Sequence, residues 1–224
     1  MGEMAELRVS DGHVLDSYVA RPAGKPAAGL VVIQEIFGLN RHIRAIADSY
    51  AADGFLVIAP ALFDRVEKGV ELGYDGADTP RGMALMRKLA TASTLLDIDA
   101  ALDHARSETG ARCGVIGFCF GGLMAWLSAA RLRPDAVVGY YAGRIGDYAD
   151  ETPRAPVQLH FGRLDTHIPA DQVEKVRAAH PEVEINWYDD AGHGFNCDMR
   201  SSFHAASAAL ARARALGFLR SHMG

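Results

Sequence analysis

The chain alternates short, uniformly apolar segments with longer segments in which apolar residues recur at helical spacing. The short segments are rich in β-branched and aliphatic residues and do not alternate between apolar and polar positions. They cover 29–35, 54–60, 113–118, 135–141, 155–162 and 183–189. Strands that are apolar on both faces belong to a sheet with helices on both sides. The pattern therefore predicts a mostly parallel sheet that is buried on both faces.

Between the predicted strands, apolar residues recur every three or four positions, as in the run through Phe203, Ala206 and Leu210. The segments with this spacing are 41–53, 93–108, 120–132, 170–179 and 202–220. Repeated alternation of strand and helix is typical of a doubly wound α/β fold. Residues 14–20 follow an Asp-Gly turn and predict an opening hairpin ahead of the parallel strands.

No linker or break in composition divides the 224 residues, so we expect a single domain over 1–224. The least regular segment is 61–92, which carries Gly69, Gly73, Gly76 and Pro80 and follows the end of a predicted strand. We interpret this segment as a lid over a site.

Composition narrows the class of protein. Hydrophobic residues make up 49% of the chain, the net charge is −5 and the basic residues are scattered, so we expect no nucleic-acid partner. Three cysteines without CxxC spacing indicate free thiols in a reduced compartment. There is no secretory signal pattern and no apolar run of membrane-spanning length, and we expect a cytoplasmic protein that does not bind membranes. Nucleotide-binding and metal-ligand motifs are missing from the sequence, which predicts no cofactor and no metal.

A lone cysteine stands at the junction of a predicted strand and a predicted helix. The stretch GFCFG (117–121) ends the apolar run 113–118 and opens the helical segment 120–132. In a Gly-x-nucleophile-x-Gly turn, the nucleophile occupies a sharp corner and the glycines relieve crowding of the backbone. The helix directs free N–H groups and the positive end of its dipole at this corner, which stabilises a thiolate or an oxyanion. The pattern indicates Cys119 as a nucleophile, although a small buried residue that packs a strand end is the alternative.

Two further residues occupy loops after later strands, in the order nucleophile, acid, histidine that is typical of hydrolases with this turn. Asp165 follows the strand 155–162, and His193 lies between two glycines after the last strand. Active sites of open α/β sheets form at the carboxyl ends of the strands, where all three candidates lie. Asp165 could instead cap the helix 170–179, and His167 competes with His193 as the base.

The chain resembles the dienelactone hydrolases, whose enzymes are carboxymethylenebutenolidases, over most of its length. The matching stretches are QEIFGLN (34–40), GFLVIAPALF (54–63), VIGFCFGG (115–122), VGYYAG (138–143) and WYDDAGHGF (187–195). The resemblance is specific, because ordinary α/β-hydrolases carry serine at the elbow and lack QEIFG after the third strand. It implies an α/β-hydrolase fold, with a mostly parallel central sheet, helices on both faces and an N-terminal hairpin.

The resemblance implies a role for each of the candidate residues. Cys119 would be the nucleophile, His193 the base and later proton donor, and Asp165 the group that orients His193. The backbone N–H groups of Phe120 and Ile36 would form the oxyanion hole, each worth about 3 kcal/mol. The substrate-binding residues that it implies are Arg81, Tyr140 and Phe37.

Glu35 is the unusual member of the implied catalytic set. A carboxylate beside a thiol ordinarily opposes ionisation of the thiol. The resemblance implies a gate, in which Glu35 pairs with the Cys119 thiol at rest and accepts its proton when substrate binds. The alternative is that Glu35 is a strand-end residue that holds an arginine, either Arg81 or Arg144.

One position departs from the family pattern. Members that open dienelactone hold its free carboxylate with arginines, one of them shortly after the catalytic histidine, where this chain has Cys197. Asn196 and Arg200 lie nearby. A cysteine cannot make the paired hydrogen bonds that an arginine makes to a carboxylate.

Three hypotheses for function follow. The first is a cofactor-free hydrolase that opens an enol-lactone or ester such as dienelactone through a thioester on Cys119. The second is a general carboxylesterase or thioesterase with a neutral pocket. The third is a non-catalytic ligand-binding or thiol redox-sensing protein. For the hydrolase we expect a small-molecule lactone or ester as substrate and a monomer or small homo-oligomer.

Overall fold

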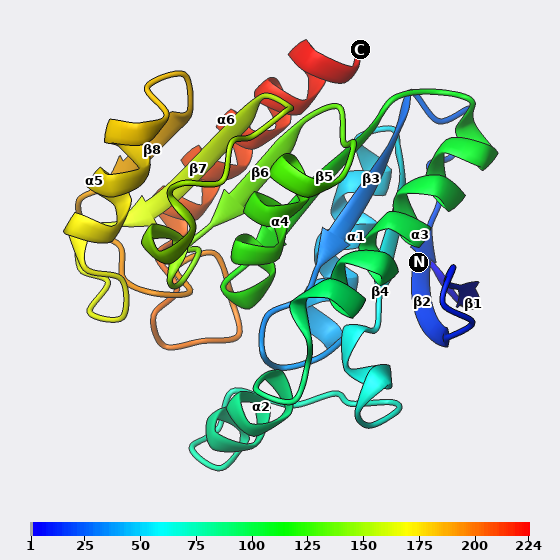
Figure 1. Ribbon diagram of the computed structural model, residues 1–224, viewed down its shortest axis with the longest axis horizontal. Coiled ribbons are helices and arrows are strands. Elements are labelled where there is room, and N and C mark those ends of the chain that lie inside the picture. The colour runs from blue at the N-terminus through cyan, green and yellow to red at the C-terminus, as the bar shows by residue number, and fades with distance from the viewer. Residues whose placement is uncertain (1) are drawn as a thin grey trace.

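Within residues 2–224, which the computed structural model describes, eight strands form one sheet (Figure 1). The strands are β1 (Glu3–Arg8), β2 (Val14–Ala20), β3 (Ala28–Ile33), β4 (Phe55–Pro60), β5 (Cys113–Phe118), β6 (Val137–Tyr140), β7 (Val157–Gly162) and β8 (Glu184–Tyr188). Their order across the sheet is β1-β2-β4-β3-β5-β6-β7-β8. The hairpin β1–β2 is antiparallel and β2 pairs antiparallel with β4, whereas the other pairs are parallel. The predicted hairpin and mostly parallel sheet are confirmed.

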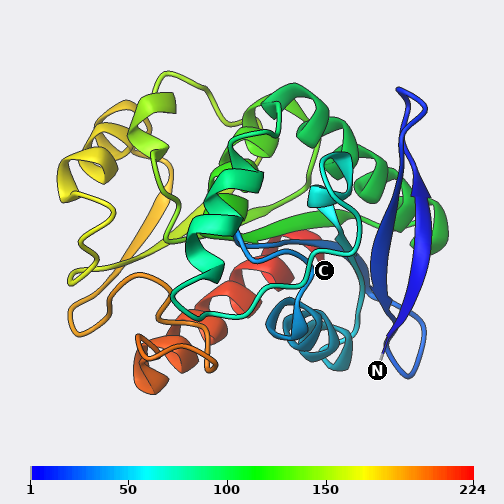
Figure 2. The same cartoon turned by 90° about the horizontal axis from the view of Figure 1, so that it is seen from below.

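Helices cover both faces of this sheet. They are α1 (Arg41–Ala52), α2 (Asp78–Met86), α3 (Thr91–Thr109), α4 (Phe120–Arg131), α5 (Ala170–Ala179) and α6 (Ala205–Met223), with short 3₁₀ turns η1 (Leu62–Arg65) and η2 (Ile145–Tyr148). Figure 2 shows α1 and α6 on one face and α3 and α4 on the other. Every residue of β3, β4, β5 and β7 is buried, as strands between two helical layers require. Within residues 2–224, no helix is both long and apolar enough to cross a bilayer.

The segment 61–92 is more regular than its sequence indicates. It contains η1 and α2, and α2 lies beyond the carboxyl ends of the central strands (Figure 1). Pro80 and Gly82 are poor helix formers, but Pro80 stands in the first turn, where its missing N–H group has no partner to lose. A Cβ atom on Gly82 would lie 2.1 Å from the carbonyl oxygen of Ile36, so only glycine allows α2 to pack this closely.

A buried ion pair fixes the start of the same segment. Nε and Nη2 of Arg65 in η1 donate hydrogen bonds to the two carboxylate oxygens of Asp97 in α3, at 2.8 and 2.7 Å. The side chain of Asp97 has no exposed surface. Burial raises the pKa of the Asp97 carboxyl group, and the Arg65 guanidinium opposes that rise. The pair therefore ties η1 to the helical layer over the sheet.

Candidate active site

Cys119 occupies a strained corner between β5 and α4. Its φ and ψ angles are +56° and −113°, a backbone conformation that residues other than glycine rarely adopt. The corner is held because its carbonyl oxygen accepts hydrogen bonds from the N–H groups of Gly122 and Leu123, at 3.0 and 3.3 Å. A Cβ atom on Gly117 would lie 1.9 Å from the carbonyl oxygen of Gly121. The glycines of the motif are therefore required by the close approach of strand and helix.

The structure brings Cys119, His193 and Asp165 into one hydrogen-bonded line. Nε2 of His193 lies 3.2 Å from Sγ of Cys119, and Nδ1 of His193 lies 2.8 Å from Oδ2 of Asp165. The other oxygen of Asp165 accepts from the backbone N–H groups of His167 and Ile168, at 2.8 and 3.2 Å. Asp165 does not cap α5, whose first turn receives no side-chain cap hydrogen bond from any residue that the structure describes. His167 contributes its amide to this line, while its ring packs edge-on against the ring of His193.

The environment of His193 favours the imidazolium form. Burial alone lowers the pKa of His193, but the negative charge of Cys119 and the hydrogen bond to Asp165 outweigh burial and raise the pKa to about 10. A positively charged imidazole beside a thiolate is the arrangement that activates catalytic cysteines.

We expect Cys119→Ser to lower the pKa of His193 toward its ordinary value. The substitution removes the negative charge of Cys119, so the Asp165 carboxylate alone remains to raise the pKa against the lowering effect of burial. NMR titration of isotope-labelled histidine measures this pKa directly. In the wild type, the charged imidazole stabilises the fold fully below the unfolded pKa of about 6.5, and this contribution is lost as the pH rises through about 10.

Cys113→Ser is the control for this titration, because Cys113 is a buried thiol of β5 outside the site. It should leave the His193 titration unchanged. A wild-type His193 that titrates at its ordinary value would contradict the proposed ion pair.

Two backbone N–H groups beside Cys119 are available to a ligand. Phe120 begins α4, and Ile36 lies in the loop after β3. Among residues 2–224, neither amide donates a hydrogen bond to another group of the protein. Both residues line the same pocket as Cys119. Free amide donors at such a position can stabilise an alkoxide that develops on a bound carbonyl group.

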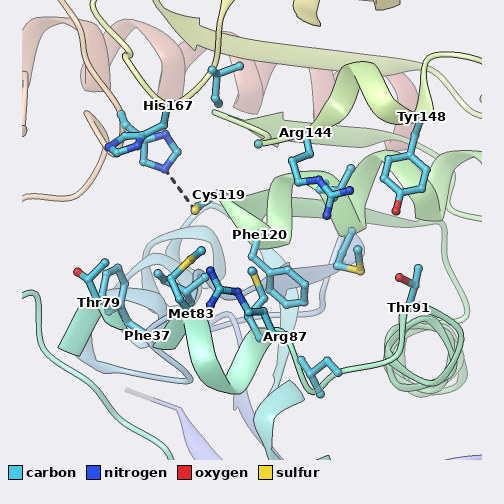
Figure 3. A pocket seen from close by; sticks show the side chains of 18 of the residues that line it. Phe37, Thr79, Met83, Arg87, Thr91, Cys119, Phe120, Arg144, Tyr148 and His167 are labelled. Carbon is cyan, nitrogen blue, oxygen red and sulfur yellow. Dashed lines mark hydrogen bonds between the residues drawn. The ribbon is translucent and has the colours of Figure 1, made fainter. Parts of the chain in front are cut away.

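The pocket that contains Cys119 and His193 has a volume of about 560 Å³. Its apolar lining includes Ile36, Phe37, Met83, Met86, Leu89, Phe120, Leu123 and Met124. Three arginines, Arg87, Arg144 and Arg200, also line it. Figure 3 shows Arg87 and Arg144 reaching toward the same space from opposite sides. The pocket thus combines apolar walls with positive charge, and α2 supplies one of the walls.

Glu35 is buried next to the pocket, with 1% of its side chain exposed. The Tyr74 hydroxyl donates a hydrogen bond to its Oε2 at 3.2 Å, and Nη1 of Arg200 lies 3.6 Å from its Oε1. Burial, followed by the charge of Glu35, raises the pKa of the Tyr74 hydroxyl well above its usual range. No hydrogen bond joins Glu35 to Cys119 within the described residues, since the thiol pairs with His193.

The arginine beside Glu35 is neither of the two considered from the sequence. Arg81 pairs with Glu67 and Arg144 pairs with Asp147, whereas Arg200 approaches Glu35. Gly194, directly after His193, makes room for it, because a Cβ atom there would lie 2.5 Å from Nη1 of Arg200.

The structure places only one of the three expected substrate-binding residues, Phe37, in the pocket lining. Arg81 is 54% exposed, pairs with Glu67 at 2.6 Å and does not line the pocket; Arg87 of the same segment does. Tyr140, at the end of β6, is 1% exposed and stacks on His160 in the core, with ring centroids 4.5 Å apart. Phe37 lies in the pocket lining as expected.

Comparisons with known proteins agree with this architecture. Residues 15–223 match the model of the dienelactone hydrolase family. A carboxymethylenebutenolidase of Pseudomonas putida is 31% identical in an alignment that covers 97% of this chain and 95% of that protein. A crystal structure of a Klebsiella pneumoniae protein assigned to the dienelactone hydrolases superposes with a TM-score of 0.86 at 31% identity, covering 98% of this chain and 99% of the other.

A more distant structure shows the fold alone. An esterase of Pyrococcus furiosus superposes with a TM-score of 0.74 at 16% identity, covering 100% of this chain and 93% of that one. Together with the strand order and the helical layers, these likenesses show the α/β-hydrolase fold that the sequence predicts. The chain belongs to the dienelactone hydrolase family and is a hydrolase of carboxylic ester or lactone bonds.

Proposed function

We propose that this hydrolase opens enol-lactones that carry a free carboxylate, such as dienelactone, through a thioester on Cys119. The observation that carries the proposal is the hydrogen-bonded line from Cys119 through His193 to Asp165, at a pocket that three arginines line. The carboxymethylenebutenolidase of Pseudomonas putida supports this choice of substrate class.

In the proposed reaction, the Cys119 thiolate attacks the lactone carbonyl carbon while His193 carries the proton. The carbonyl oxygen becomes an alkoxide that accepts hydrogen bonds from the N–H groups of Phe120 and Ile36. The ring carbon–oxygen bond then breaks, and the leaving enolate takes the proton from His193. A water molecule gives a proton to His193 and attacks the thioester, which releases the acid and restores the thiolate. Asp165 keeps the imidazole oriented throughout.

Glu35 completes the proposal as the group that positions Arg200. Its contacts with Tyr74 and Arg200 leave Sγ of Cys119 hydrogen-bonded to His193, which is the pairing that the proposed attack uses. A substrate carboxylate would draw Arg200 away from Glu35, since a charged guanidinium binds whichever carboxylate is better placed. In this reaction the thiol proton is already on His193, so Glu35 acts by positioning Arg200 and not by accepting that proton.

The test compares kcat/KM for cis- and trans-dienelactone with kcat/KM for a neutral short-chain aryl ester. We expect the wild type to prefer the dienelactones. Arg87→Gln and Arg144→Gln should each lower kcat/KM for dienelactone by about tenfold, because a hydrogen bond between charged groups contributes about 1.5–3 kcal/mol. The neutral ester should be affected little.

Arg81→Gln is the matched control, because Arg81 lies on the same segment but pairs with Glu67 outside the pocket. It should leave both rates unchanged. If the wild type prefers the neutral ester, and the substitutions of Arg87 and Arg144 do not change kcat/KM, the enzyme is a carboxylesterase or thioesterase that acts on neutral substrates.

A further inference from the structure

A second group of chemically active side chains lies outside the pocket of Cys119. His42 is in the first turn of α1, and Cys197 and Asp198 are in the loop that follows His193. One potential ligand atom from each of these three residues lies within 4.8 Å of the others. Nδ1 of His42 is 3.5 Å from Oδ1 of Asp198. None of the three residues lines the pocket, so the proposed ester chemistry does not account for them.

The imidazole of His42 is unusual for a buried ring. Its side chain is 3% exposed, and its Nε2 atom makes no hydrogen bond within the described part of the chain. Buried polar atoms nearly always have a partner, because an unmade hydrogen bond in the interior is costly. Oε1 of the buried Glu35 also lacks a hydrogen bond. These unmade hydrogen bonds set His42 apart from the satisfied polar groups of the core.

We propose that His42, Cys197 and Asp198 bind a zinc ion. Imidazole nitrogen, thiolate sulfur and carboxylate oxygen are the ligand atoms that zinc prefers in proteins. With their usual bond lengths, tetrahedral zinc requires ligand atoms about 3.3–3.7 Å apart, the longer separations being those to sulfur. The pair His42–Asp198 already has this spacing, and Sγ of Cys197 lies within 4.8 Å of a ligand atom of each. A water molecule completes the tetrahedron.

Burial and exposure are distributed as such a site requires. Cys197 is fully buried and His42 nearly so, which fixes two ligands in place. The Asp198 side chain is 71% exposed, so the ion enters from solvent on that side and the carboxylate is free to adjust. His42 lies far along the chain from the adjacent residues Cys197 and Asp198, and for this reason the sequence contains no metal-binding motif.

The ion would join α1 to the loop that carries Arg200. That arginine stands two positions after Asp198, lines the pocket and approaches Glu35. Zinc at this site therefore cross-links the loop to α1 and fixes the position of the loop. Cys197 stands where the family resemblance implies a carboxylate-binding arginine. The proposed zinc site therefore depends on a residue in which this chain departs from the family pattern.

The test uses Cys119→Ser protein freed of metal by chelation, because Cys119 and His193 could otherwise bind the ion themselves. Titration with Co²⁺ should give a sulfur-to-cobalt charge-transfer band that saturates at one ion per chain, and Zn²⁺ should displace the cobalt. Adding Cys197→Ser should abolish the band and lower the zinc affinity at least about tenfold. Adding Cys113→Ser, the matched buried thiol, should change neither.

Asp198→Asn serves as a second variant, because its side chain is exposed and its replacement leaves the core intact. It too should lower the zinc affinity at least about tenfold. The proposal is overturned if the Cys119→Ser protein gives no sulfur–cobalt band, or if the band survives Cys197→Ser.

Discussion

Replacement of Cys119 by alanine should lower kcat for ester and lactone substrates by about 10⁴-fold or more, because the covalent route then has no nucleophile. The fold should be retained, since within residues 2–224 the half-buried Cys119 side chain hydrogen-bonds only to His193. Steady-state kinetics measures the loss of turnover. Rapid quenching with a slow substrate, followed by mass spectrometry of the digested wild type, should show the acyl group on the peptide that contains Cys119.

The control for this experiment is Cys113→Ser, which removes a buried thiol at the start of β5, the strand that leads to Cys119, without touching the site. Its kcat should match that of the wild type. An alanine variant that keeps wild-type turnover, or an acyl group on another residue, would refute the thioester mechanism. A direct attack by water, activated by His193, would then be the mechanism to consider.

Replacement of Arg65 by leucine should lower the free energy of unfolding by about 3–5 kcal/mol, because it leaves the buried Asp97 carboxylate without a partner. Denaturant titration at neutral pH measures the change. The loss should shrink in acid. Burial keeps the pKa of Asp97 in the folded state above its unfolded value, so the variant regains stability as the pH falls and the carboxyl group takes up a proton.

Arg81→Leu is the matched control, since Arg81 makes an ion pair with Glu67 in which both side chains are about half exposed. Such surface pairs contribute less than about 1 kcal/mol. Equal effects of the two substitutions, or a loss in the Arg65 variant that does not depend on pH, would show that the buried charge of Asp97 is not the cause.

Most of the fold could be predicted because the apolar pattern is continuous where strands are buried on both faces. The strand prediction 29–35 nevertheless runs past the end of β3 at Ile33. Gln34 and Glu35 are buried as well, so burial alone does not mark where the ladder of hydrogen bonds stops. Helix α2 could not be predicted, because Pro80 and Gly82 disfavour a helix unless the packing against Ile36 is known.

In the candidate site too, residues marked by local sequence could be predicted, whereas residues placed by tertiary packing could not. Cys119, Asp165 and His193 are marked by local turn chemistry, and the structure places them within hydrogen-bonding distance. The pocket arginines carry no such mark, because the direction of a loop side chain depends on tertiary packing. Arg87 could be assigned to the pocket only once α2 is known, since Met83 and Arg87 are four positions apart and therefore share one face of the helix.

The contact between Gly82 and the Ile36 carbonyl joins two properties that are usually considered separately. Helix α2 supplies much of the wall that selects a substrate, and Ile36 supplies one of the amides proposed to polarise its carbonyl group. Any repacking of α2 that accommodates a new acyl group therefore presses on, or withdraws from, the residue that carries this amide. Variants selected for an altered substrate preference should therefore also show altered turnover, because both depend on the contact between Gly82 and Ile36. Redesign of the pocket should leave the residues at this contact unchanged.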